Sequence, residues 1–197
     1  YLEDGFDLQF TDMGNGFFVE IGSPRGEQLL ARFSGFFEKQ PESAREAKQK
    51  IHDEAVRKFE VKVDMQKAVE ILKTDKIKDG FWQKWADQCI YCGGCSYSCC
   101  TCTCFNVVDR GTEKEGIRYR CWDSCQFGGY TREASQHNPR PKDYQRMKRW
   151  FEHKLKYDVM TNGTYSCMGC GRCASVCPGS IGMINVVSEI CAKGDIQ

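Results

Sequence analysis

Two cysteine runs of the same spacing decide how this chain is organised: Cys89-Ile-Tyr-Cys92-Gly-Gly-Cys95-Ser-Tyr-Ser-Cys99 and Cys167-Met-Gly-Cys170-Gly-Arg-Cys173-Ala-Ser-Val-Cys177. Each run fits C-x2-C-x2-C-x3-C. Three thiols at this short interval on a tight loop can each bind a different iron of one inorganic cluster. Glycines within the runs let the backbone curl around the cluster and point N–H groups at its sulfur atoms. The repeat therefore predicts two iron–sulfur sites of one design.

The spacing is that of bacterial ferredoxins, in which the fourth cysteine of each run ligates the other cluster. We therefore predict two 4Fe-4S clusters with exchanged ligands. The first is held by Cys89, Cys92, Cys95 and Cys177, and the second by Cys167, Cys170, Cys173 and Cys99. Structural zinc typically uses two C-x2-C pairs and needs no third cysteine at the same interval. A zinc-stabilised interaction module is the alternative from the binding class.

The chain contains 14 cysteines, none of them before Cys89. Thiols this crowded have poor geometry for bridging one another, which argues against a disulfide scaffold and favours metal binding in a reducing cytoplasm. Five cysteines lie between the two runs: Cys100, Cys102, Cys104, Cys121 and Cys125. Those at 102, 104, 121 and 125 bracket a predicted hairpin, so they could hold a third 4Fe-4S cluster or a zinc ion, or be buried free thiols. We interpret Cys191 as a core thiol.

Composition excludes several classes of function. The 28 Lys and Arg nearly balance the 27 Asp and Glu, for a net charge of +1, which argues against nucleic-acid binding. No apolar run is long enough to span a membrane, and no secretory leader is recognisable, so we expect a cytoplasmic protein. The first residue is Tyr1, which leaves open whether the N-terminus is complete.

The pattern of apolar residues predicts an α+β protein. Residues 1–22 read as a β-hairpin with Asn15-Gly16 in its turn, followed by helices from Pro24 to about Glu38 and from Pro41 onward. Shorter helices are expected after Asp64 and Asp79. We interpret residues 1–88 as a scaffold or docking region. Residues 89–197 are expected to form a ferredoxin-like two-cluster domain with an insertion over 100–166, which contains strands at 104–109 and 117–122 and a basic helix at 143–157.

No catalytic constellation is recognisable. The chain has no nucleophile elbow, P-loop or dinucleotide-binding glycine motif. His52 is expected to be solvated, and His137 and His153 are weak candidates for ligands. The basic stretch 140–149 is interpreted as a cover over the anionic clusters or as a docking face, since cations near a cluster favour its reduced form.

An ordered set of motifs resembles the dicluster ferredoxin-like family that includes the sulfhydrogenase β subunit and its counterpart in anaerobic sulfite reductases. The motifs are Phe6-Asp7-Leu8, Val19-Glu20-Ile21-Gly22-Ser23, Cys89–Arg110, Arg118-Tyr-Arg-Cys-Trp-Asp-Ser-Cys125, His137-Asn-Pro-Arg-Pro141, His153-Lys154 and Cys167–Pro178. The resemblance supports Cys102, Cys104 and Cys125 as one functional set. Cys100, where the family usually has proline, and Cys121 depart from the pattern, which leaves open whether either completes a third site.

The resemblance also implies a role. Members of this family pass electrons between a flavin-containing protein linked to NAD(P) and a catalytic hydrogenase or reductase subunit. We therefore expect an electron relay in an oxygen-sensitive cytoplasmic complex, without a clear catalytic centre of its own. The enzyme-class alternative is that the third cysteine group holds a cluster that itself acts on substrate. The terminal electron donor or acceptor and the direction of electron flow stay open.

Overall fold

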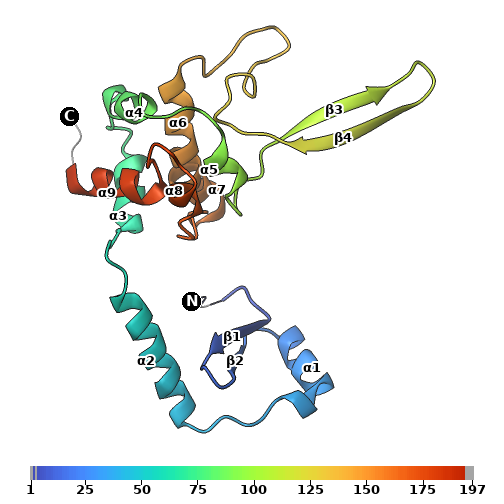
Figure 1. Ribbon diagram of the computed structural model, residues 1–197, viewed down its shortest axis with the longest axis vertical. Helices are drawn as coiled ribbons and strands as arrows, with labels where there is room; N and C mark the ends of the chain where they lie inside the picture. The colour runs from blue at the N-terminus through green and yellow to red at the C-terminus, as the bar shows by residue number, and fades with distance from the viewer. Residues whose placement is uncertain (1, 3, 194–197) are drawn as a thin grey trace. The chain divides into compact units, whose positions relative to one another are not determined.

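The computed structural model describes residue 2 and residues 4–193, and shows the α+β class that the sequence predicts. The chain divides into two compact units, Tyr1–Lys62 and Val63–Gln197. Each is described by itself (Figure 1). Among the described helices, none has both the length and the apolar character needed to cross a bilayer.

The first unit contains the predicted hairpin. Strands β1 (Leu8–Asp12) and β2 (Phe17–Ile21) pair antiparallel, with Leu8 opposite Ile21. Met13 N–H donates to the carbonyl of Gly16 at 2.9 Å and closes the turn. Phe18 is buried, so the hairpin has one covered face. The prediction for residues 1–22 is confirmed within the described range, outside which Tyr1 and Glu3 lie.

Helix α1 (Pro24–Arg32) begins where the sequence predicts. The Ser23 hydroxyl accepts a hydrogen bond from Gly26 N–H at 3.2 Å, and proline occupies the first helical position. The helix ends six residues earlier than expected, because Ser34 and Gly35 favour the short 3-10 turn η1 (Ser34–Phe36) over a longer helix. Helix α2 (Ser43–Arg57) follows, and its Lys48 pairs with Glu20 of β2 at 2.7 Å.

The second unit is mainly helical, with one hairpin. Its elements are, in chain order, α3 (Met65–Lys73), α4 (Asp79–Ala86), α5 (Gly94–Tyr97), β3 (Phe105–Gly111), β4 (Gly116–Trp122), α6 (Asp143–Glu152), the π-helical turn η2 (His153–Tyr157), α7 (Asp158–Asn162), α8 (Arg172–Ser175) and α9 (Met183–Lys193). The basic helix expected over 143–157 thus passes into a wider π-helical turn after Glu152. Such turns are frequent at functional sites.

The core of this unit is built from helices far apart in the sequence. Helix α4 packs on α6, and α3 packs on α9 and η2. The Trp82 and Phe151 rings lie 5.8 Å apart at their centroids, and both are buried. Other fully buried side chains are Val69, Leu155, Val186, Val187 and Ile190. Because apolar side chains of α3 and α4 need this core, the compact units divide at Lys62 and Val63, whereas the change in composition lies at Cys89.

The β3–β4 hairpin extends away from the helices of its unit (Figure 1). It matches the predicted strands, and its register runs from Phe105 opposite Trp122 to Gly111 opposite Gly116. Most of its side chains are exposed. The hairpin therefore contributes little to the core, but its base brings residue 104 beside residue 123, where Asp123 N–H donates to the Cys104 carbonyl at 3.0 Å.

Candidate metal centre

The two cysteine runs fold into matching loops. Gly93 and Gly171 have left-handed backbone angles, with φ of 74° and 73°, and each is followed by one short helix, α5 or α8. Two residues earlier, Tyr91 and Gly169 are also left-handed, with φ of 52° and 68°. Helices α5 and α8 lie against each other. The repeat in the sequence is therefore a repeat in the structure.

The first thiol group gathers around Cys89. Burial raises the pKa of Cys89, and the neighbouring thiols of Cys177 and Cys92 raise it further, against a hydrogen bond from Tyr91 N–H at 3.4 Å. Burial likewise raises the pKa of Cys95 to about 12, with Cys89 among its anionic neighbours. Cys177, from the second run, accepts a hydrogen bond from the backbone N–H of residue 181 at 3.3 Å. The structure thus places Cys177 beside the first run.

The second thiol group combines cysteines of the second run with the fourth cysteine of the first run. Burial raises the pKa of both Cys167 and Cys173, and the thiol of Cys99 contributes to the rise at each. Cys170 is a further neighbour of Cys173. Met183 N–H donates to the Cys173 sulfur at 3.4 Å. Cys99, from the first run, is thus placed beside the second.

A buried cation lies next to this exchanged thiol. Lys154 of η2 is only 3% exposed, and its ammonium donates to the Thr101 hydroxyl at 2.8 Å. That hydroxyl lies 3.3 Å from the Cys99 sulfur. Burial alone would raise the pKa of Cys99, but the hydrogen bonds with Thr101 and the charge of Lys154 outweigh it and lower the pKa to about 7. Conversely, the thiols of Cys102 and Cys99 raise the pKa of Lys154 against the effect of burial.

Three of the five intervening cysteines also come together. The hydrogen bond with Cys125 is the main cause that lowers the pKa of Cys104 to about 5, and it raises the pKa of Cys125. Cys102 is a further anionic neighbour of Cys125. The Tyr130 hydroxyl hydrogen-bonds to Cys104 and contributes to its low pKa.

The other cysteines lie elsewhere. Cys121 sits within β4 opposite Asn106, and exposed Cys100 contacts the Met168 sulfur at 2.9 Å. Cys191 donates to the Asp64 carbonyl at 3.2 Å.

The residues fit iron–sulfur clusters. A 4Fe-4S cube binds each thiolate at a separate iron, so its ligands surround a volume and need not meet at one point. Within the described part of the chain, no three His, Cys, Asp or Glu side chains are grouped closely enough to hold a single metal ion. Backbone N–H groups already point at three of the sulfurs, those of Cys89, Cys173 and Cys177, as ligand sulfurs require.

Sequence reasoning missed two groups at this site. Lys154 was expected as part of a basic helix and of the His153-Lys154 motif, but its burial was not predicted, because nothing in its spacing distinguishes a buried lysine from a solvated one. Arg146, within the basic stretch 140–149, is also buried; its guanidinium donates to the Gln126 carbonyl at 3.0 Å and lies 5.4 Å from the centroid of the Tyr91 ring. Arg146 therefore fastens the first cysteine loop to α6.

Comparisons with known proteins agree with this arrangement. Residues 88–181 match the model of the 4Fe-4S dicluster domain. The chain is 28% identical over 194 residues to the sulfhydrogenase 2 subunit beta of Pyrococcus furiosus, which covers 96% of this chain and 56% of that protein. It is also 28% identical over 171 residues to the F420-dependent formate dehydrogenase subunit beta of Methanocaldococcus jannaschii, covering 83% of this chain and 36% of that protein. No solved structure matches the chain.

The chain spans about half the length of the first relative and about a third of the second. The match to the dicluster model covers both cysteine runs, whose motifs the sequence analysis identified as iron–sulfur sites. Residues 88–181 thus match the 4Fe-4S dicluster domain, and the chain is similar to the sulfhydrogenase β subunit, in agreement with the resemblance of its ordered motifs.

Proposed function

We propose that this chain relays single electrons through two 4Fe-4S clusters within a larger oxidoreductase complex. The first cluster is assigned to Cys89, Cys92, Cys95 and Cys177, and the second to Cys167, Cys170, Cys173 and Cys99. The observation that supports this assignment is that each run contributes its fourth cysteine to the other group. Cys177 of the second run neighbours Cys89, and Cys99 of the first run neighbours Cys167 and Cys173. Clusters bound there would supply reversible one-electron chemistry.

In this role the protein would hold the two clusters, shield them from water and stabilise the charge on their ligand sulfurs. Five of the eight proposed ligands pack against the apolar core, which limits access of water to them: Cys89, Cys95, Cys167, Cys173 and Cys177. The backbone N–H groups of Tyr91 and Met183 donate to ligand sulfurs and stabilise negative charge on them. Each proposed cluster keeps one exposed ligand, Cys92 in the first and Cys170 in the second. These two positions give an electron one exposed route to each cluster.

The proposed partners follow from the relatives. Sulfhydrogenase and formate dehydrogenase β subunits are each one subunit of a larger enzyme by name. By analogy, we assign this chain a place between a flavin-containing protein linked to NAD(P) and a catalytic hydrogenase or reductase subunit, in the cytoplasm. Co-purification of the natural complex under anaerobic conditions, with identification of its chains, tests this part directly.

The cluster assignment is tested by chemical analysis of the chain prepared without oxygen. We expect at least about eight irons and eight acid-labile sulfides per chain, with visible absorbance that bleaches on reduction. Replacing Cys99 or Cys177 by serine should each disturb one cluster, whereas Cys191→Ser should change neither. Fewer than about eight irons in intact protein would refute the relay.

A further inference from the structure

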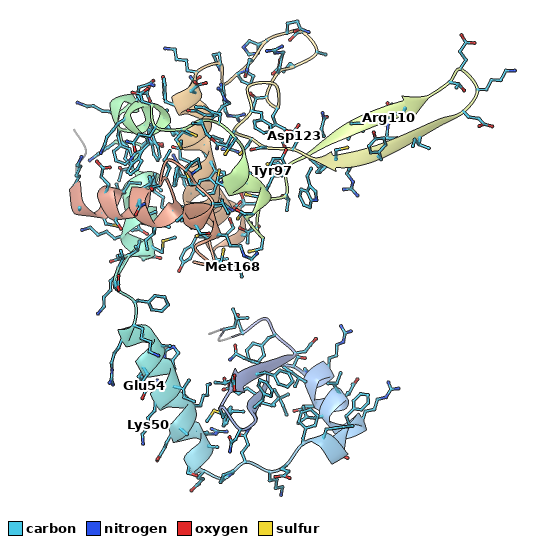
Figure 2. The ribbon with its side chains drawn as sticks, in the orientation of Figure 1. Lys50, Glu54, Tyr97, Arg110, Asp123 and Met168 are labelled. Atoms are coloured by element: carbon cyan, nitrogen blue, oxygen red, sulfur yellow. The ribbon has the colours of Figure 1, made fainter. Side chains whose placement is uncertain are left out.

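A small cavity adjoins the cysteines that the two proposed clusters leave unused. Its volume is about 90 Å³, several times the roughly 10–15 Å³ that one water molecule needs. It is lined by Ser96, Tyr97, Cys99, Cys102, Cys104, Trp122 and Asp123. Figure 2 labels Tyr97 and Asp123 near the base of the β3–β4 hairpin. Of the lining residues, only Cys99 belongs to the clusters assigned above.

The base of the hairpin gathers the unused thiols. Phe105 and Trp122 form the last pair of the ladder, and Asp123 N–H then donates to the Cys104 carbonyl at 3.0 Å. This contact holds the segment after β4 beside the segment before β3, so that Cys104 and Cys125 are hydrogen-bonded. Cys102 reaches the same place by a turn in which its N–H donates to the Cys99 carbonyl at 3.2 Å.

We propose that Cys102, Cys104 and Cys125 hold a third 4Fe-4S cluster, with the Asp123 carboxylate as its fourth ligand. Three thiolates leave one iron of a cube without a cysteine. Among the residues that line the cavity, Asp123 alone has a carboxyl side chain, and a carboxylate is an established ligand for iron. The site is separate from the two clusters of the proposed function and adds a third centre beside Cys99.

The charge distribution supports an anionic group at this place. Lys154 is buried, and a buried ammonium is stable only beside an anionic partner. Its anionic neighbours are the thiols of Cys102 and Cys99. One of these belongs to the proposed third site and the other to the second cluster. Lys154 thus lies where it can balance the negative charge of both.

The geometry also distinguishes the proposed ligands from the two other cysteines of this region. Cys121 lies within the ladder of the hairpin opposite Asn106, and Cys100 is exposed against Met168. Neither lines the cavity, whereas Cys102 and Cys104 do. Cys125 is not among the lining residues either, but unlike Cys121 and Cys100 it is hydrogen-bonded to the lining residue Cys104. Cys121→Ser is therefore a matched control, since it changes a thiol only four residues from Cys125 without removing a proposed ligand.

Metal and sulfide analysis of the anaerobically prepared chain, by native mass spectrometry, tests the site. The parent protein should contain about twelve irons, the triple variant Cys102→Ser/Cys104→Ser/Cys125→Ser about eight, and Cys121→Ser about twelve. Asp123→Asn should lose about one iron, as Fe²⁺, from the third cluster. One-electron oxidation of the remaining three-iron centre with ferricyanide should then produce the electron paramagnetic resonance signal of its oxidised form.

The outcomes separate this proposal from the proposed function. A parent protein with about eight irons would overturn the third site without any variant and leave the two-cluster relay intact. Zinc in place of the last four irons, lost in the triple variant, would overturn the cluster assignment. Full iron content in Asp123→Asn would remove Asp123 from the ligand set. Fewer than eight irons in the parent would instead refute the relay itself.

Discussion

Replacing Lys154 by methionine should lower the reduction potential of the second cluster. Lys154 is buried, and its ammonium reaches the Cys99 sulfur through Thr101, with contacts of 2.8 and 3.3 Å. The ammonium is therefore no more than about 6 Å from that sulfur, where two unit charges interact by roughly 3 kcal/mol at an effective dielectric constant of about 20.

The added electron is spread over the whole cluster, so we take about half of that interaction. The resulting loss of about 1.4 kcal/mol is a tenfold change in the reduced fraction and lowers a one-electron potential by about 60 mV. The sign follows because the removed positive charge had favoured the more negative, reduced form. Methionine preserves much of the apolar volume of the side chain and leaves the charge as the main change.

The assay is a redox titration followed by electron paramagnetic resonance on protein with full iron content. Lys154→Arg keeps the charge and should retain most of the potential. Lys84→Met removes an exposed lysine paired with Glu189 at 2.7 Å and is the control for loss of a surface charge. If the Lys154→Met potentials lie within about 10 mV of the parent values, the charge argument is refuted.

Three further predictions concern stability of the anaerobic, cluster-containing protein in denaturant. Trp82→Ala should cost about 3–5 kcal/mol, because Trp82 is fully buried in the helical core; a loss below about 1 kcal/mol would show that the core is placed wrongly. Gly93→Ala should lower the free energy of unfolding by more than about 1 kcal/mol, since Gly93 has φ of 74° and an added Cβ would lie 2.8 Å from the Phe127 ring. Gly80→Ala in α4 is the control: no atom lies within 4 Å of its added Cβ, so this change should be neutral or stabilising by up to about 1 kcal/mol. Glu189→Gln should destabilise the protein by up to about 1 kcal/mol at pH 7. Burial raises the pKa of Glu189, but hydrogen bonds from Lys193 and Lys84 outweigh burial and lower the pKa. The stability that the Glu189 carboxylate contributes is therefore present above pH 4.5 and is lost as pH falls through its folded-state pKa. An equal effect of Glu189→Gln at pH 7 in the parent and in a Lys84→Met/Lys193→Met background would contradict that assignment.

The sequence predicted those features that depend on local spacing. Ser23-Pro24 began a helix, Asn15-Gly16 lay in a hairpin turn, and the C-x2-C-x2-C pattern placed two similar loops, because each is determined by a few adjacent residues. Features that depend on tertiary packing were not predictable. The end of α1, the position of the division between the two units and the burial of Lys154 are settled by contacts between residues distant in the sequence.

The third cysteine group lies between these two cases. Predicted strands on either side of a polar loop were enough to infer that residues 102, 104, 121 and 125 would approach one end of a hairpin. Which thiols share that end depends on the register of the strands. Trp122 pairs with Phe105, so Cys121 remains within the ladder, while Cys125 lies beyond it and contacts Cys104. A shift of one residue in the register would have exchanged the faces of the strand and the choice of thiols.

The two cysteine loops have similar backbones but different surroundings. Tyr91 occupies a left-handed position that costs a non-glycine residue about 1–2 kcal/mol, whereas the second loop has Gly169 at the matching place. The Tyr91 ring packs against the guanidinium of Arg146, and Arg146 is held by backbone carbonyls, so tertiary contacts offset the local strain. An added Cβ at Gly93 would strike Phe127, but one at Gly169 or Gly171 would meet no atom within 4 Å. The spacing of the cysteines thus makes the loops alike, and packing against α6 and the segment after the hairpin fixes only the first of them.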